Sequence, residues 1–283
     1  MSTSHTEHAG AGPPRLEEVS PDVYAYLQPD GSWFLNNTGF LAGRHGVISI
    51  DTTSTERRTR AYLEAIGRVT RQPVRTLINT HHHGDHTHGN CLLPLATIVG
   101  HPLCREEILR TPFPPPPGVW SDVEWGDLHV EPPFVTFEGV LTVWVDNLRL
   151  ELHTVPTPAH TTNDLVVWIP ERSVLFTGDL VFAGGTPFVP MGSVSGSLAA
   201  LERLKTFGAK TLVPGHGPVS GPEVMDDVAA YLRFVQDTAQ RGKAAGQSPL
   251  DAAPGAPEEL GRVVARDIER WSAVAKAAGI RNE

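Results

Sequence analysis

The spacing of hydrophobic positions along the chain predicts a protein that mixes strands and helices. Short apolar runs, rich in Val, Ile and Leu, cover residues 46–51, 74–79 and 98–100, and such runs are typical of buried strands. Between the first two runs, Tyr62, Ile66 and Val69 recur at helical spacing among charged residues, so an amphipathic helix is expected over 55–70. The same reasoning predicts further strands at 40–43, 141–145, 148–154, 164–169, 173–176 and 211–213, and helices near 104–109, 197–207, 223–241 and 258–278.

Turn-forming residues predict a hairpin near the N-terminus, and changes in composition predict four segments along the chain. Pro29-Asp30-Gly31-Ser32 lies between the runs 23–27 and 33–36, which predicts two strands joined by this turn. We expect a flexible tail over 1–18, a catalytic domain over 19–241, a linker over 242–257 and a C-terminal helix over 258–283. The Pro- and Trp-containing segment 111–139 is long for a loop inside a compact domain.

Composition narrows the class of protein. The 283 residues include 23 basic and 32 acidic side chains, so the formal net charge is −9, and 40% of the residues are hydrophobic. This acidic balance argues against a nucleic-acid partner. No apolar run approaches the roughly 18 residues that cross a bilayer, so no membrane association is expected. The two cysteines make no disulfide framework, and the polar N-terminus does not resemble a secretion signal. We therefore expect a cytoplasmic protein.

A dense group of polar side chains follows the strand expected at 74–79. The run His81-x-His83-x-Asp85-His86 places three imidazoles and a carboxylate within six residues. Nitrogen and oxygen donors of this kind suit zinc and other divalent ions. His81 and His83 face one side of an extended segment, so they can bind one ion while Asp85 and His86 turn toward a second.

Three later segments each carry one further ligand-competent side chain, which we expect at a turn after a strand. These residues are His160, Asp179 and His216. With the first run, in this order, the chain resembles the metallo-β-lactamase superfamily from about residue 20 to 235. The resemblance implies an α/β fold, a four-layer αββα sandwich, with a centre of two metal ions.

The same resemblance implies a role for each residue. His81, His83 and His160 would hold metal one, Asp85, His86 and His216 would hold metal two, and Asp179 would bridge the ions together with a water or hydroxide. The cofactor would be two Zn²⁺ ions, with iron or manganese as alternatives. Two cations about 3.5–4 Å apart lower the pKa of a shared water toward 7 and polarise a carbonyl oxygen. Asp85 and Asp179 are the predicted catalytic residues, and Asp85 can orient the nucleophile or accept its proton.

A narrower resemblance concerns residues 24–33 and 36–39. They are similar to the metallo-β-lactamase-type second-ring cyclases of bacterial aromatic polyketide pathways of the actinorhodin type. This similarity implies an intramolecular aldol condensation with loss of water on a chain carried by an acyl carrier protein. Thioester hydrolysis would be a natural second activity. Asp179 stands where secreted zinc β-lactamases usually have Cys, which argues against a β-lactamase.

Other readings of the same ligands stay open. They are a general hydrolase of thioesters, esters or lactones that resembles glyoxalase II, a single-iron persulfide dioxygenase, and a non-catalytic binding protein stabilised by metal. The substrate would be a small molecule or an acyl thioester, and the sequence predicts no oligomeric state. His82 is expected to point away from the ions, while His88 and Asn90 are candidates either for hydrogen bonds to ligands or for the surface. The residues expected to line a substrate pocket are Trp33, Phe34, Trp120, Trp125, Phe188 and Met191.

Overall fold

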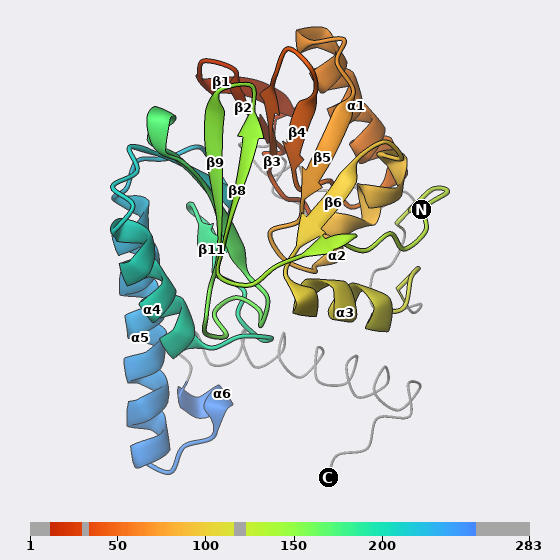
Figure 1. Ribbon diagram of the computed structural model, residues 1–283. Coiled ribbons are helices and arrows are strands. Elements are labelled where there is room, and N and C mark those ends of the chain that lie inside the picture. Colours follow the sequence, from red (N-terminus) through yellow and green to blue (C-terminus); the bar gives the residue numbers. More distant parts are fainter. Residues whose placement is uncertain (1–11, 30–33, 116–122, 253–283) are drawn as a thin grey trace. The chain divides into compact units, whose positions relative to one another are not determined.

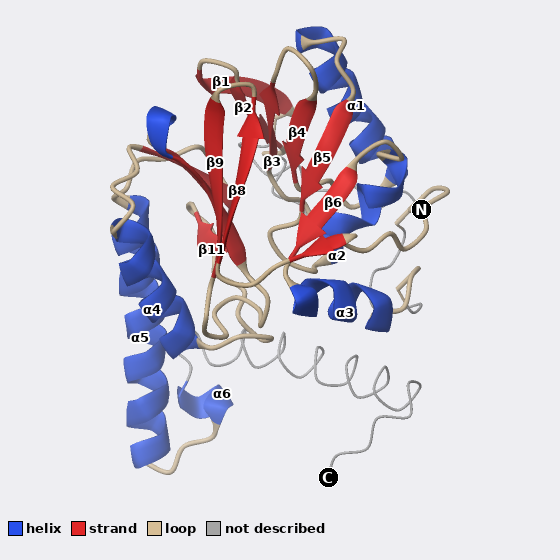
Figure 2. Cartoon of the chain, in the orientation of Figure 1, coloured by secondary structure: helices blue, strands red, loops and turns tan. Residues whose placement is uncertain are grey.

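Two β-sheets stacked face to face, with helices outside them, form the framework of the protein. The computed structural model describes residues 12–29, 34–115 and 123–252. Figures 1 and 2 show α1 (Glu56–Val69) beside one sheet and α4 (Val194–Lys205) beside the other, with both sheets between them. This is the αββα arrangement expected from the sequence.

The first sheet has seven strands that follow one another in chain order. Its first four strands are antiparallel neighbours, and the pairs from β4 onward are parallel, so α1 and α3 (Pro102–Arg110) each lie near a parallel connection. Between β5 and β6 the chain forms the short helix α2 (Gly84–Thr87) and the 3₁₀ helix η1 (His88–Leu92). The strands are β1 (Arg15–Ser20), β2 (Val23–Leu27), β3 (Thr38–Ala42), β4 (Val47–Ile50), β5 (Val74–Ile78), β6 (Thr97–Gly100) and β7 (Val135–Thr136).

The second sheet has five strands in the order β12-β11-β10-β9-β8. All pairs are antiparallel except β11 with β12, and a 3₁₀ turn, η2 (Pro170–Arg172), joins β10 to β11. The strands are β8 (Val140–Val145), β9 (Leu148–Thr154), β10 (Leu165–Ile169), β11 (Val174–Phe182) and β12 (Thr211–His216).

Alternation along the strands decides which side chains fill the space between the sheets. Val23, Ala25 and Leu27 of β2 point into this core and meet Leu152 and Phe176 of the second sheet within one buried cluster. The sheets approach closely at Gly39, where a Cβ atom would lie 2.2 Å from the Phe176 ring. A residue with a side chain at position 39 would therefore push the two sheets apart.

The opposite face of the first sheet is covered by α1, which begins where the sequence predicts. Thr55 is the N-cap, and its Oγ1 accepts a hydrogen bond from the backbone N–H of Arg58. Tyr62 on this helix is fully buried, and its hydroxyl donates a hydrogen bond of 2.7 Å to the Gly39 carbonyl. It also lies 2.8 Å from Ser49 Oγ. The tyrosine therefore connects the helix to β3 and β4 together.

Several boundaries differ from the expectations. A strand at 33–36 was expected to pair with β2. Residues 34–37 form no strand, so this prediction is wrong, and β2 pairs with β3 instead. Strand β1 begins at Arg15, inside the expected tail. Strand β11 does not end before Asp179 but continues to Phe182, so Asp179 lies within a strand rather than at a turn. Within 111–139, the described residues form loops and the two-residue strand β7.

The chain divides into two compact units. One comprises Met1–Thr111 with Glu124–Ala229, and the other comprises Pro112–Val123 with Ala230–Glu283. The second contains most of α5 (Val224–Ala244) and the short helix α6 (Pro249–Ala252), so structure continues into the expected linker. The helix expected at 258–283 lies outside the described residues. No described helix has the length and apolar character needed to span a bilayer.

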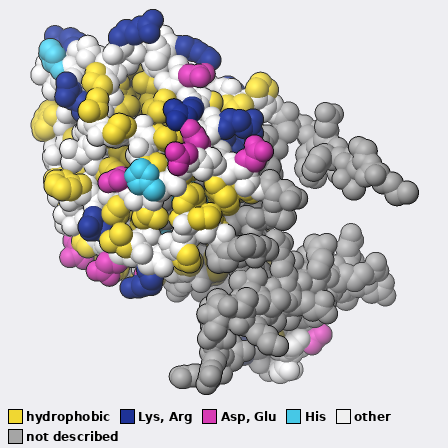
Figure 3. Space-filling view, turned by 90° about the vertical axis from the view of Figure 1, so that its right-hand side faces the viewer, with side chains coloured by type: hydrophobic (Ala, Val, Ile, Leu, Met, Phe, Trp, Pro, Cys, Tyr) yellow, Lys and Arg dark blue, Asp and Glu magenta, His cyan; other side chains and the backbone are white. Residues whose placement is uncertain are grey.

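Charged and apolar side chains are mixed on the molecular surface. On the face shown in Figure 3, Lys and Arg stand among Asp, Glu and hydrophobic side chains. The exposed ion pairs, such as Arg60 with Glu56 at 2.7 Å, contribute little to stability because solvent screens their charges. The stability of the fold therefore depends mainly on the buried clusters.

The hydroxyl of Tyr62 provides a test of this packing. We expect Tyr62→Phe to lower the free energy of unfolding by about 1–3 kcal/mol, because the change leaves a buried carbonyl and a buried hydroxyl with one partner fewer. Denaturant unfolding would measure the effect. The control is Tyr231→Phe, since Tyr231 is 41% exposed and should change stability by less than about 0.5 kcal/mol. Equal stability of the two variants would contradict the prediction.

Candidate metal centre

The first group of candidate ligands lies where β5 ends. After Ile78 the chain passes through Asn79 and Thr80 and then places His81 and His83 before the short helix α2. Asp85 and His86 lie within α2 and are 5% and 0% exposed. Because the carboxyl ends of parallel strands meet at one edge of a sheet, residues 79–86 lie beside the end of β4, the parallel neighbour of β5.

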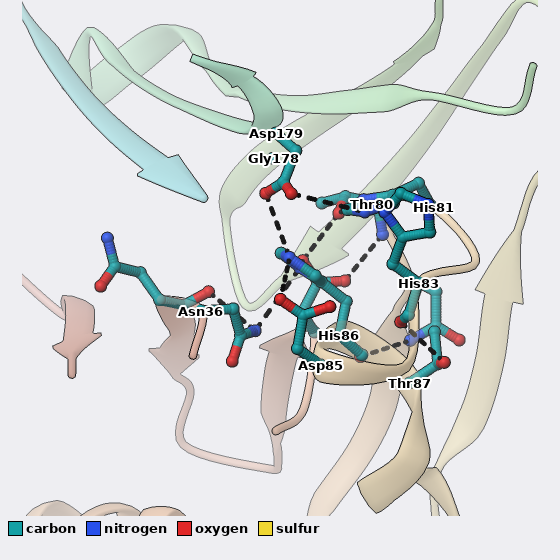
Figure 4. A network of polar contacts seen from close by, with 12 residues as sticks. Asn36, Thr80, His81, His83, Asp85, His86, Thr87, Gly178 and Asp179 are labelled. Atoms are coloured by element: carbon teal, nitrogen blue, oxygen red, sulfur yellow. Dashed lines mark hydrogen bonds and ion pairs between the residues drawn. The ribbon is translucent and has the colours of Figure 1, made fainter. Parts of the chain in front are cut away.

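The second sheet supplies the remaining candidates from three different places. His160 lies in the connection between β9 and β10, Asp179 lies in β11, and His216 is the last residue of β12. The chain twists at Gly178, where φ is +50° and a Cβ would lie 2.9 Å from Thr80 of the first sheet. This close approach brings Asp179 to the segment after β5 (Figure 4).

The seven side chains gather into two groups, which match the two ligand sets that the family resemblance implies. His81, His83, His160 and Asp179 form one group, and Asp85, His86 and His216 form the other, with ligand atoms in each group within 4.8 Å of one another. We call these the first and the second group.

Asp179 lies between the two groups. Its Oδ1 is 3.1 Å from His86 Nε2, and its Oδ2 is 3.1 Å from His216 Nε2. The same Oδ2 lies 3.3 Å from His160 Nε2 and 3.7 Å from His81 Nε2. Figure 4 shows the carboxylate pointing at His86 and toward His81. One carboxylate thus faces imidazoles of both groups, which is the geometry of a bridging ligand.

Unsatisfied polar atoms test whether a metal fits here. In the described part of the chain, Nε2 of His81, Nε2 of His86 and Oδ1 of Asp179 are buried and make no hydrogen bond of normal geometry, although the last two atoms lie 3.1 Å apart. An unsatisfied buried polar atom costs about 1–3 kcal/mol, so three of them in one cluster are unusual unless a ligand binds there. All three atoms are good donors for zinc. The donor set therefore fits two divalent ions.

Burial prepares two of the imidazoles for ligation, whereas Asp179 and Asp85 raise the pKa of His86 and of His216 against the effect of burial. Loss of solvent lowers the pKa of His81 and of His83 well below the usual range, with further lowering from neighbouring imidazoles. Both rings are therefore neutral near pH 7, which is the form that binds a metal. Burial alone raises the pKa of the Asp179 carboxyl, but the imidazoles around it, chiefly those of His216 and His86, hold that pKa well below its usual range.

Four of the imidazoles are also held by their outer nitrogens. His81 Nδ1 lies 3.0 Å from Thr80 Oγ1, and His86 Nδ1 lies 2.8 Å from Asp51 Oδ2. His160 Nδ1 contacts the Phe188 carbonyl. His83 is turned the other way, with Nδ1 2.9 Å from His160 Nε2 and Nε2 3.2 Å from the Met191 sulfur. These contacts fix which nitrogen of each ring faces the centre.

Asp51 is a functional candidate that the sequence reasoning missed. It is 2% exposed, and its carboxylate accepts hydrogen bonds of 2.7 Å from both the backbone N–H and the hydroxyl of Thr80, besides its contact with His86. Burial raises the pKa of Asp51, and the charge of His86 and the Thr80 bonds oppose the rise. The signal was its place directly after β4, the parallel neighbour of β5.

The expected pocket residues fall into two places. Phe188 and Met191 lie beside the first group and are 41% and 54% exposed. Phe34 and Trp125 instead form an aromatic trio with His88, with ring centroids 5.4–5.8 Å apart. Burial lowers the pKa of His88 to about 4, so this ring is neutral at ordinary pH. Trp33 and Trp120 lie outside the described residues.

Two polar neighbours of the ligands have structural contacts. His82 points away from the centre, as alternation predicts, and lies against Asn163, whose Oδ1 accepts a bond of 3.1 Å from the His82 N–H. Asn90 is buried and bonds Thr52, Asn79 and the Glu131 carbonyl, so it is neither a surface residue nor a direct partner of a ligand ring.

Comparison with known proteins gives one family and several relatives. A model of the metallo-beta-lactamase superfamily matches residues 31–216, which are 186 of the 283 residues. The beta-lactamase-like protein 2 homolog of Caenorhabditis elegans is 28% identical over 221 residues, which cover 77% of this chain and 68% of that protein.

Two further curated relatives match over shorter stretches. The 2,4-dinitroanisole O-demethylase subunit alpha of Nocardioides is 33% identical over 62% of this chain and 51% of its own length. The hydroxyacylglutathione hydrolase of Rhodospirillum rubrum is 30% identical over 48% of this chain and 45% of its own. The chain thus spans about half the length of these two proteins.

A solved structure supports the fold. The metallo-beta-lactamase from Pontibacter korlensis superimposes with a TM-score of 0.64 at 22% identity, covering 78% of this chain and 99% of that chain. At this identity the likeness extends to the arrangement of sheets and helices.

The contact between Asp51 and His86 generates a prediction. We expect Asp51→Asn to weaken metal binding by about 10–100-fold, because the amide cannot accept all three hydrogen bonds and carries no charge to support the imidazole. Competition with a chelating dye would measure the affinity. Asp146→Asn is a matched control, since Asp51 and Asp146 both have positive φ, at 60° and 50°, and Asp146 lies on an exposed turn. Unchanged affinity in Asp51→Asn would exclude the proposed role of this carboxylate.

Proposed function

The chain belongs to the metallo-beta-lactamase superfamily, and we propose that it hydrolyses an acyl thioester or ester at a centre of two zinc ions. The observation that carries this proposal is the pair of adjacent donor groups with Asp179 between them. Support also comes from the relative named hydroxyacylglutathione hydrolase, whose name states the hydrolysis of an acylglutathione.

In the proposed reaction, the metal ions and the side chains of the protein would have different tasks. Two bound divalent ions would supply Lewis acidity to a carbonyl oxygen and would lower the pKa of a water toward 7. In thioester hydrolysis the water oxygen bonds to the carbonyl carbon, the C–S bond breaks, and one water proton passes to the leaving sulfur. We assign the Asp85 carboxylate the role of carrying that proton, through the oxygen that holds no ion. Its Oδ2 lies 3.6 Å from His216 Nε2 and 3.7 Å from His86 Nε2, so Oδ2 is the candidate ligand atom of the second group.

The first group has the surroundings for the acyl part of a substrate. Phe188 and Met191 place partly exposed apolar side chains beside His83, with the Phe188 ring centroid 6.1 Å from the His83 ring. We therefore propose that an apolar acyl group contacts these two residues. An acyl carrier protein as the carrier of that group, and the cytoplasm as the place of action, stay predictions from the sequence.

A second-ring polyketide cyclase is the second candidate. It was expected from residues 24–33 and 36–39, and the same donor groups could stabilise an enolate during an aldol step. The resemblance partly depended on a second strand at 33–36, and the described residues 34–36 form no strand. None of the relatives named above is a cyclase by name. Hydrolysis is therefore the function that we put first.

One experiment separates the two candidates. The zinc-loaded protein is incubated with a hydroxyacylglutathione, an acyl thioester of N-acetylcysteamine and a β-polyketone thioester, and the products are analysed by mass spectrometry. We expect gain of one water with release of the thiol. Loss of one water from a chain still attached to its thiol would favour the cyclase. Metal binding without turnover of any substrate would favour a non-catalytic, metal-stabilised protein.

Removal of the proton carrier gives a sharper test of the mechanism. With zinc at saturating concentration, we expect Asp85→Asn to lower kcat for the hydrolysed thioester by about 10²–10⁴-fold, because the amide cannot accept a proton. Asp85→Asn should weaken binding at the second group, and Asp179→Asn should abolish turnover and weaken binding at both groups, which share this carboxylate. Circular dichroism should show an unchanged fold in both variants. Asp22→Asn, on the exposed turn before β2, is the control, and turnover by Asp85→Asn equal to this control would contradict the assigned role.

A further inference from the structure

Asn37 ties the first sheet to the segment that carries His216. Its backbone N–H donates a 2.6 Å hydrogen bond to the Gly215 carbonyl. Its side-chain Nδ2 donates bonds of 2.9 Å to the Pro214 carbonyl and 2.7 Å to the Gly217 carbonyl. Asn37 is 6% exposed, and its partners lie on both sides of His216. The residue therefore holds the His216 segment from the side of the opposite sheet.

The His216 segment needs such a support. In the described part of the chain, β12 is an edge strand whose ladder partner is β11, and His216 comes at its end. The next residue, Gly217, has φ of +94°, so the chain turns away there. The side chain of His216 is 24% exposed, whereas those of Asp85 and His86 in the same group are 8% and 0% exposed. His216 is thus the most exposed candidate ligand of the second group.

Asn36, the residue before Asn37, contacts His86, another candidate ligand of the second group. Asn36 Nδ2 donates a 2.8 Å bond to the Thr52 carbonyl and lies 3.4 Å from His86 Nδ1. Gln28 holds this pair of asparagines, with its Nε2 2.9 Å from the Asn36 carbonyl and its N–H 3.4 Å from Asn37 Oδ1. Two consecutive residues thus contact His86 and the His216 segment, which come from different sheets.

We propose that Asn37 is a positioning residue that sets the place of His216 and thereby the affinity for the ion of the second group. This inference rests on the two-ion centre of the proposed function. An amide is suited to the task because it offers two N–H donors to two carbonyls while its oxygen accepts from Gln28. A carboxylate in the same place would direct its lone pairs at two carbonyl oxygens.

Asn163 is the counterpart of Asn37 at the first group. It is fully buried and comes from the connection between β9 and β10, while its partner His82 lies between His81 and His83. Its side chain therefore ties the His160 connection of the second sheet to the first group. A change at Asn163 is chemically the same as one at Asn37 but acts on the other group, so it serves as a matched control.

The test is a zinc titration of the metal-free full chain in competition with a chelating dye, which resolves two binding steps. We compare wild type with Asn37→Ala, Asn37→Asp and Asn163→Ala. Both Asn37 variants should bind one ion with wild-type affinity and the other about 10–100-fold more weakly, with the larger loss in Asn37→Asp. Asn163→Ala should weaken the first-group ion and leave the second-group step within about threefold of wild type. Excess zinc should restore the second equivalent in Asn37→Ala.

Melting of the metal-free proteins separates positioning from general destabilisation. If Asn37→Ala and Asn163→Ala melt at similar temperatures, their different binding profiles cannot come from unfolding. If Asn37→Asp does not fold, Asn37→Ser replaces it as the second variant. Two undiminished binding steps in the Asn37 variants, or equal weakening of both steps, overturns the proposal, and so does a wild type that binds one ion only. Because these readouts are metal affinities, a wild type that binds two ions but hydrolyses no thioester contradicts the proposed function alone.

Discussion

The division of the candidate ligands between two sheets is the constraint on which the rest of the structure depends. Four of them follow β5, and three come from the second sheet. Since metal–ligand distances tolerate errors of about 0.2 Å, the sheets must be held at a fixed separation where their strands end. The N–H of Leu165 donates a 2.8 Å bond to the Thr80 carbonyl, and the contact of Gly39 with Phe176 sets the spacing deeper in the core. The packing of the apolar core therefore also sets the distance between the candidate ligands of the two sheets.

The charges and the burial of the candidate ligands explain why cations would stabilise this arrangement of imidazoles and carboxylates. The centre buries the neutral imidazoles of His81 and His83 beside the carboxylates of Asp179 and Asp85. Three buried atoms of the centre make no hydrogen bond in the described structure. Burial of such groups is unfavourable unless each finds a partner of opposite character. Positive ions satisfy imidazole nitrogens and carboxylate oxygens at once, and they become the largest local charges. The same donor atoms that cost stability without metal would stabilise the fold with metal.

What could be predicted from the sequence depended on how local each signal is. The run from His81 to His86 is a signal within six residues, and the later ligands could be placed by their order after strands. Asp179 was expected at a turn because Gly178 follows an apolar run, but the positive φ and the register shift at this glycine let β11 continue. The Asn37 contacts join residues 177 and 180 positions apart, so no local pattern could indicate them.

The two groups differ in the residues that contact the outer ring nitrogens of their imidazoles, that is, the nitrogens that face away from the centre. This difference makes the imidazoles of the two groups unequal in basicity. In the first group, the outer nitrogens of His81, His83 and His160 face a hydroxyl, a thioether and a backbone carbonyl. In the second group, the outer nitrogen of His86 faces the Asp51 carboxylate. A carboxylate partner raises the basicity of an imidazole, whereas a thioether is a weak acceptor.

This inequality gives the two groups different tasks. An ion held by the weaker donors of the first group would keep more Lewis acidity for a carbonyl oxygen, and this group lies beside the apolar Phe188 and Met191. The second group holds Asp85, the residue assigned to the proton. In the proposed hydrolysis, the substrate carbonyl would lie beside His83 and the water beside Asp85, and the loop between β11 and α4, which carries Phe188 and Met191, would contact the acyl group. The candidate ligands are compatible with several reactions, so we expect the residues of this loop, rather than the ligands, to decide which substrate the proposed site accepts.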